Sequence, residues 1–165
     1  MTVHPPPARL PARLPRGPRC RPAVRTGAGS LDGSMRIARA LYDQMLAHAQ
    51  ADAPNECCGM VATRDGEAVT VHRAENTAAS PLKFVIDPRE LYATYTAIED
   101  DGLEFGAIYH SHTRTEPYPS QTDINFARGW PGVQWLIFGL AGPEPTARIY
   151  EIRDGEVVEH PVQVE

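Results

Sequence analysis

The stretch Tyr109–Asp123, YHSHTRTEPYPSQTD, places two histidines, a serine and an aspartate within fifteen residues. It continues the apolar run Phe105-Gly-Ala-Ile-Tyr109, which is typical of a buried strand. Side chains two positions apart on a strand point to the same face, so His110 and His112 can reach one ion. Ten residues separate His112 from Asp123, enough for a loop to bring the carboxylate to the same place. The stretch therefore predicts a metal site at the end of a strand.

The three predicted ligands suit zinc. Two imidazole nitrogens and one carboxylate oxygen leave the fourth tetrahedral position of Zn²⁺ open to water, as in catalytic zinc sites. Two other interpretations stay open: the histidines can simply be exposed in a loop, and Ser120 and Asp123 fit the N-cap and N3 positions of a helix. The helix is compatible with a metal site, because it would hold Asp123 in its first turn.

These residues resemble the signature of the JAMM, or MPN+, metalloproteases. That signature is an upstream Glu, then His-x-His, ten residues and Asp, with Ser three positions before the Asp. Glu56, His110, His112, Ser120 and Asp123 supply every element. The resemblance implies one Zn²⁺ per chain and makes Glu56 the carboxylate that accepts a proton from water. By itself, an acidic residue at a strand start is usually just solvated. Ser120 is our candidate hydroxyl donor to the oxyanion.

Within that family the wording YHSHTxTExYPSxTD, the short chain and PNECCGM at residues 54–60 are most similar to the actinobacterial Mec type. Those enzymes release cysteine from the C-terminus of the ubiquitin-like sulfur carrier CysO. The similarity implies a sulfur-carrier partner with a C-terminal cysteine adduct. Arg114 could pair with the free carboxylate of that cysteine, the alternative being a solvated loop arginine.

Two other functions follow from the same resemblance. The first is an isopeptidase acting on another ubiquitin-like modifier. The short stretch from Asp123 to Val133 leaves no room for the long insertion with which deubiquitinating relatives hold ubiquitin chains. The second is a non-catalytic MPN scaffold, which is disfavoured because no ligand is missing.

Composition divides the chain near residue 34. Residues 1–34 hold six Arg, one Asp and seven Pro, a local charge of +5, whereas residues 35–165 carry −10. The first segment is predicted to be a disordered Pro/Arg-rich tail, or an extension upstream of a natural start at Met35. Residues 35–165 are predicted to form one JAMM/MPN+ catalytic domain, whose acidic charge argues against a nucleic-acid partner.

The cysteines indicate a reducing compartment. Cys20, Cys57 and Cys58 are odd in number and two are adjacent, so they suggest no disulfide framework. We expect Cys57 and Cys58 to be small buried residues beside the site. No apolar run approaches the roughly 18 residues of a membrane span. A cytoplasmic protein without a membrane partner is therefore expected.

The remaining pattern predicts the elements around the site. Helices are expected over 35–53, from the N-cap Asp87 to Gly102, and over 124–128. Strands are expected at 56–62, 68–73, 84–86, 105–109, 133–140, 146–152 and 156–164, the last interrupted by Pro161. Asp65-Gly66 and Asp154-Gly155 predict tight turns. The expected fold is α+β: a mixed, mostly antiparallel curved sheet flanked by helices, which the resemblance further describes as JAMM/MPN-like and cytidine-deaminase-like.

Overall fold

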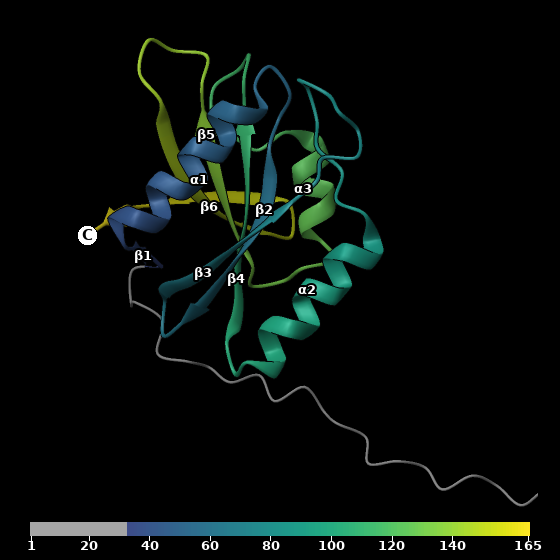
Figure 1. Cartoon of the computed structure of the whole chain (residues 1–165), viewed down its shortest axis with the longest axis vertical. Coiled ribbons are helices and arrows are strands. Elements are labelled where there is room, and N and C mark those ends of the chain that lie inside the picture. Colours follow the sequence, from purple (N-terminus) through teal and green to yellow (C-terminus); the bar gives the residue numbers. More distant parts are fainter. Residues whose placement is uncertain (1–32) are drawn as a thin grey trace, which may run out of the picture.

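The structure, a computed structural model, describes residues 33–165 as one eight-stranded sheet with three helices (Figure 1). The strands are β1 (Met35–Ile37), β2 (Cys58–Arg64), β3 (Glu67–Ala74), β4 (Glu104–His112), β5 (Gln134–Gly139), β6 (Thr146–Arg153), β7 (Glu156–His160) and β8 (Val162–Val164). The helices are α1 (Arg39–Asp52), α2 (Pro88–Asp100) and α3 (Gln121–Ala127). The predicted tail falls outside the described residues up to position 32. Gly33 and Ser34 belong to the folded part, because Ser34 is buried and Gln134 Nε2 donates to the Gly33 carbonyl at 2.6 Å.

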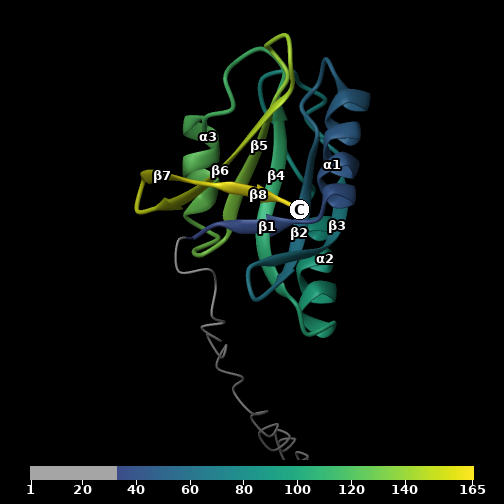
Figure 2. The same cartoon turned by 90° about the vertical axis from the view of Figure 1, so that its left-hand side faces the viewer.

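The sheet is mixed and mostly antiparallel, as predicted. Its strand order is β7-β6-β5-β4-β2-β3-β1-β8, with parallel pairings at β4–β5, β1–β3 and β1–β8 and antiparallel pairings elsewhere. Strands β7 and β8 lie at opposite ends of this order, yet only Pro161 separates them in the chain. The sheet therefore curls almost into a barrel, and Figure 2 shows β8 continuing from β7 to run beside β1.

The sheet divides the core into two layers. Helix α1 packs its buried residues, such as Met45, against the face that carries Tyr109 and Phe138. Helices α2 and α3 cover the other face, which carries Ile108 and Trp135 (Figure 1). Successive side chains of β4 thus point into different layers, as the strand period requires. No described helix is long and apolar enough to cross a membrane.

Several local predictions are confirmed. Both tight turns have positive φ at the acidic residue and at the glycine, 51° and 77° at Asp65-Gly66 and 53° and 85° at Asp154-Gly155. Glycine adopts this conformation without a Cβ clash, which is why such pairs connect hairpins. Asp87 caps α2 through bonds from two backbone N–H groups. Pro161 does interrupt the last strand.

Two local predictions are wrong. Met35–Ile37 are not helical but form β1, because their backbone pairs with β8, a partner more than a hundred residues away in sequence. Phe84–Ile86 are not a strand. The Val85 N–H donates to Asn76 Oδ1 at 3.0 Å, and the Val85 carbonyl accepts from the Thr77 N–H at 2.9 Å. These local partners take the place of a neighbouring strand.

Candidate metal centre

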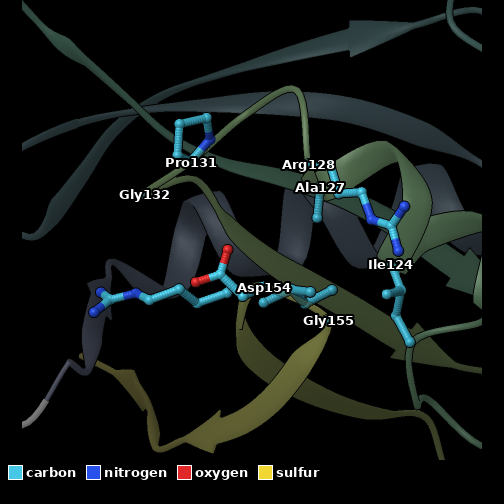
Figure 3. Close-up of a pocket in the computed structure, with 9 residues that line it drawn as sticks. Ile124, Ala127, Arg128, Pro131, Gly132, Asp154 and Gly155 are labelled. Atoms are coloured by element: carbon cyan, nitrogen blue, oxygen red, sulfur yellow. The ribbon is translucent and has the colours of Figure 1, made fainter.

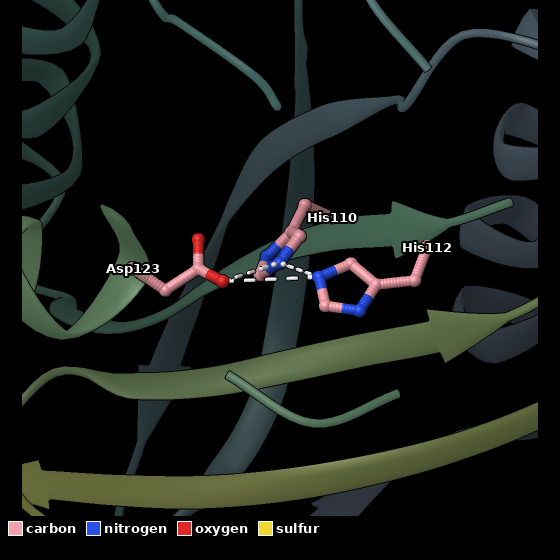
Figure 4. A group of neighbouring side chains, drawn as sticks. All are labelled: His110, His112 and Asp123. Atoms are coloured by element: carbon pink, nitrogen blue, oxygen red, sulfur yellow. Dashed lines mark hydrogen bonds and ion pairs between the residues drawn. The ribbon is translucent and has the colours of Figure 1, made fainter. Parts of the chain in front are cut away.

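Three predicted ligands meet where β4 ends and α3 begins. His110 and His112 project from the same face of β4, and Asp123 reaches them from the first turn of α3 (Figure 4). The two Nε2 atoms lie 3.2 Å apart, and Asp123 Oδ2 lies 3.4 Å from His110 Nε2 and 3.7 Å from His112 Nε2. All three side chains are buried. One nitrogen or oxygen from each therefore converges on a common point, and the three could hold a metal ion.

A capping box holds the aspartate in this position. Ser120 Oγ accepts from the Asp123 N–H at 3.2 Å, and Asp123 Oδ2 accepts from both the Ser120 N–H and the Ser120 hydroxyl at 2.7 Å. The loop before the box is tied to the sheet, because the buried Tyr150 hydroxyl donates to the Pro117 carbonyl at 2.6 Å. The helix start predicted from the sequence thus also positions the carboxylate.

The two histidines are supported differently. His112 Nδ1 lies 2.8 Å from the Glu116 carbonyl, an acceptor only, so Nδ1 carries the proton and Nε2 offers its lone pair to a metal. His110 Nδ1 is buried and has no hydrogen-bond partner among the described residues. Its imidazole lies instead against the ring of Phe84, with centroids 4.6 Å apart and planes 33° apart.

The charge of the group fits a divalent cation. Burial alone would raise the pKa of Asp123, but the nearby imidazoles of His110 and His112 and the hydrogen bond from Ser120 hold that pKa well below its usual range. Burial lowers the pKa of His110, against the opposing effect of Asp123. The favoured state of Asp123 is a buried carboxylate facing imidazole nitrogens. Two imidazoles and one carboxylate form a donor set that zinc accepts.

Glu56 lies beside this group, two residues before β2 begins, and is only 5% exposed. Burial raises the pKa of its carboxyl to about 7, with Asp123 adding to the shift and His112 opposing it. The carboxyl does not belong to the converging ligand group. A carboxyl that titrates near neutral pH can both take up and release a proton, which is the property of a general acid–base.

The other predicted residues lie around this centre. Arg114 is exposed on the loop after β4 and is not part of the buried group. Cys57 and Cys58 are free and fully buried, as expected. Burial raises the pKa of the Cys57 thiol to about 12, so the thiolate that a metal would bind is disfavoured.

Sequence reasoning missed Phe84 and Asn76. The sequence pattern predicts a strand at Phe84, whereas in the structure its ring packs on His110. Asn76 opens a polar segment and binds backbone groups on both sides of Phe84. An asparagine at the start of such a segment is a typical signal for side-chain hydrogen bonds to local backbone.

A separate cavity of about 340 Å³ lies between α3 and the β6–β7 turn (Figure 3). It is lined by Arg128, Arg153, Asp154 and neighbouring apolar residues. None of its lining residues belongs to the metal group or is Glu56. The cavity is therefore separate from the candidate metal centre.

Comparison with known proteins finds similar chains and a matching family. The family described as prokaryotic homologs of the JAB domain matches residues 38–152. The CysO-cysteine peptidase of Mycobacterium tuberculosis is 37% identical over 127 residues, covering 75% of this chain and 86% of that protein. A probable TtuB-protein conjugate cleaving protease of Thermus thermophilus is 36% identical over 123 residues, covering 74% and 78%. The solution structure of a Desulfitobacterium hafniense protein has a TM-score of 0.70 at 29% identity, covering 79% and 92%.

Proposed function

The chain belongs to the prokaryotic JAB-domain family of JAMM/MPN+ proteins, and from this premise we propose a specific reaction for it. The chain is a hydrolase of the JAMM type. We propose that it is a zinc-dependent peptidase that hydrolyses the amide bond between L-cysteine and the C-terminus of a ubiquitin-like sulfur carrier. The observation that carries the chemistry is the convergence of His110, His112 and Asp123 beside Glu56. The similarity to a CysO-cysteine peptidase supports the substrate.

His110, His112 and Asp123 would hold the zinc. Bound there, zinc supplies a Lewis acid that polarises the scissile carbonyl and makes water nucleophilic near neutral pH. The low pKa of Asp123 keeps this ligand ionised. The hydrogen bond from His112 Nδ1 to the Glu116 carbonyl fixes the tautomer of the neutral imidazole, so that Nε2 would be the nitrogen facing the metal.

Glu56 is the proposed proton carrier. With a pKa of about 7, its carboxylate can accept a proton from water and return it to the leaving amine of cysteine. Glu56 alone would then carry the proton from water to the amine. Its carboxyl is free for this role because it is buried beside the ligands and is not one of them.

Ser120 is the proposed hydroxyl donor to the carbonyl oxygen in the tetrahedral state. Its hydroxyl donates to Asp123 Oδ2, so it would have to turn from the aspartate to the substrate. Ser120 is exposed, which allows substrate to reach it. Losing one such donor typically lowers turnover by about 10²- to 10³-fold.

The proposed partner is a carrier protein whose flexible C-terminal tail enters beside the metal group. Its extended backbone can bind through main-chain hydrogen bonds without demanding particular side chains. Arg114, exposed on the loop after β4, is the proposed contact for the carboxylate of the leaving cysteine. Release of free cysteine would serve cysteine biosynthesis, which we place in the cytoplasm.

Parallel reactions test this function. Zinc-loaded protein is incubated with a sulfur carrier bearing a C-terminal cysteine and, separately, with linked di-ubiquitin, and both are followed by mass spectrometry. We expect carrier and free cysteine from the first and little or no cleavage of the second. Efficient cutting of di-ubiquitin with the carrier adduct left intact would favour the alternative, an isopeptidase. The similarity to a conjugate-cleaving protease is the observation behind that alternative.

A further inference from the structure

The segment 76–86 has no regular secondary structure apart from turns, yet it touches two residues of the candidate site. Its Phe84 lies against the imidazole of His110. Glu56 is bonded to it on both sides: the Glu56 N–H donates to the Ser80 carbonyl at 2.9 Å, and the Glu56 carbonyl accepts from Asn76 Nδ2 at 2.9 Å. One segment thus contacts a ligand and the proton carrier.

The side chain of Asn76 holds this segment together through four hydrogen bonds to backbone groups. Its Nδ2 donates to the carbonyls of Glu56 and Lys83, at 2.9 Å and 3.1 Å. Its Oδ1 accepts from the N–H groups of Ala78 and Val85, at 3.1 Å and 3.0 Å. An amide can donate two bonds and accept two, so the buried Asn76 is saturated.

Two of these four bonds lie immediately on either side of Phe84, at the Lys83 carbonyl and the Val85 N–H. The backbone that carries the ring is therefore held at both ends by one side chain. The same side chain holds the backbone of Glu56. Asn76 therefore fixes the backbone of Phe84 relative to the backbone of Glu56.

His110 depends on such a ring because, among the described residues, no hydrogen bond holds its second nitrogen, Nδ1. Its Nδ1 is buried without a partner, whereas His112 Nδ1 lies 2.8 Å from a carbonyl oxygen. Rotation of the His110 imidazole is opposed by packing, with Phe84 at 4.6 Å and Trp135 at 6.1 Å between ring centroids. Residues that fix the orientation of a metal-binding imidazole normally act through a hydrogen bond to its second nitrogen. In this site the ring of Phe84, packed against the imidazole, would fix the orientation of His110 instead.

We propose that Phe84 and Asn76 are positioning residues of the metal centre: Phe84 orients His110 by ring contact, and Asn76 holds Phe84 and Glu56 in register with each other. This inference rests on the proposed function in one respect, that the centre binds zinc. It assigns a role to two residues that neither bind the ion nor touch the substrate.

The first test compares two phenylalanine variants by zinc affinity. Phe84→Leu removes the ring that contacts His110. Phe126→Leu makes the same chemical change in the same apolar cluster, since Phe126 also contacts Phe84 and Trp135, at 6.1 Å and 5.6 Å between centroids. We expect zinc affinity to fall about 10- to 100-fold in Phe84→Leu, the size usual for lost support of a ligand, and to change little in Phe126→Leu.

Affinity is measured by competition with a chromophoric chelator, and the visible spectrum of the cobalt(II)-substituted protein reports the ligand geometry. A purely structural role of Phe84 would lower the melting temperature of both leucine variants and leave both cobalt spectra unchanged. Equal zinc affinities in the two variants would overturn the inference alone. Wild-type protein that binds no zinc would overturn the proposed function together with it.

The second test keeps every ring in place. Asn76→Asp preserves the oxygen that accepts from Ala78 and Val85 and removes the N–H donors to Glu56 and Lys83. Thr77→Val is the matched control, because it removes a hydrogen bond to Val85 from the same segment without touching Glu56. We expect Asn76→Asp to bind zinc more weakly and to lose turnover by a larger factor than affinity, since Glu56 is displaced as well. Zinc affinity and kcat equal to those of Thr77→Val would contradict the role of Asn76.

Discussion

Two polar clusters lie on opposite faces of strand β4. On one face His110 and His112 meet Asp123, and on the other Tyr109 meets His48, which in turn meets Asp52. Each cluster contains histidine and aspartate, and each joins β4 to a helix. A search for histidine near carboxylate would select both.

The clusters differ in how their atoms are arranged. The second is a chain, with Tyr109 Oη 2.8 Å from His48 Nδ1 and Asp52 Oδ2 3.2 Å from His48 Nε2. Each imidazole nitrogen of His48 has its own partner. In the first cluster two Nε2 atoms and one Oδ2 converge on a single point. Convergence indicates an ion, and a chain of paired atoms indicates structural support.

Removing the aspartate of each cluster tests this distinction with the largest expected difference. Asp123→Ala should abolish both zinc binding and peptidase activity, because it removes one of three ligands. Asp52→Ala, on the other face, should retain zinc at the wild-type ratio. Metal content after dialysis, measured by mass spectrometry, decides between them. Activity that survives exhaustive chelation of the wild-type protein would contradict a metal centre.

Glu56→Gln tests the cluster around His110 further. It distinguishes the role of the neighbouring Glu56 carboxyl from the role of the three ligands. We expect zinc to remain stoichiometric while turnover falls by about 10²- to 10⁴-fold, the usual contribution of acid–base catalysis. Metal analysis and kcat are measured on one preparation. Loss of zinc from this variant would make Glu56 a ligand and overturn its assignment as proton carrier.

Tyr109→Phe addresses the second face, where we expect an effect on stability alone. The variant removes the hydroxyl paired with His48 Nδ1 and leaves that nitrogen buried without a partner. The free energy of unfolding should fall by about 1–3 kcal/mol, as for other buried polar atoms left unpaired. Urea denaturation of the metal-free protein measures it. Unchanged zinc affinity is the accompanying expectation, and a large loss of zinc would show that the two faces are coupled.

The pH dependence of stability provides the smallest expected effect. Burial lowers the pKa of His48, against the opposing effect of Asp52, so the folded state binds a proton less readily than the unfolded chain. A depressed folded-state pKa contributes stability that is present above the unfolded pKa of about 6.5 and is lost as pH falls below it toward the folded value. Urea midpoints of the metal-free wild type should therefore decrease below about pH 6.5, and less so in His48→Gln. Equal slopes in the two proteins would remove His48 from the explanation.

Local sequence signals predicted most of the regular elements and selected three side chains that the structure brings to one point. The spacing of His110 and His112 follows from the strand period, and the position of Asp123 follows from a capping box that its own neighbours form. The turns at Asp65-Gly66 and Asp154-Gly155 follow from residues that tolerate positive φ. These features depend on contacts within a few residues, which is the range over which a sequence pattern acts.

The features that the sequence left open depend on partners distant in the chain. Strand β1 exists because its three residues pair with β8 at the other end of the folded part. The local sequence pattern gives no sign of that pairing. Phe84 leaves the expected strand because Asn76 binds the backbone on both sides of it. The sequence by itself determined which residues can bind a metal. Only the tertiary structure decided how deeply these residues are buried and what holds His110 in place, because burial and ring packing exist only once distant segments have met.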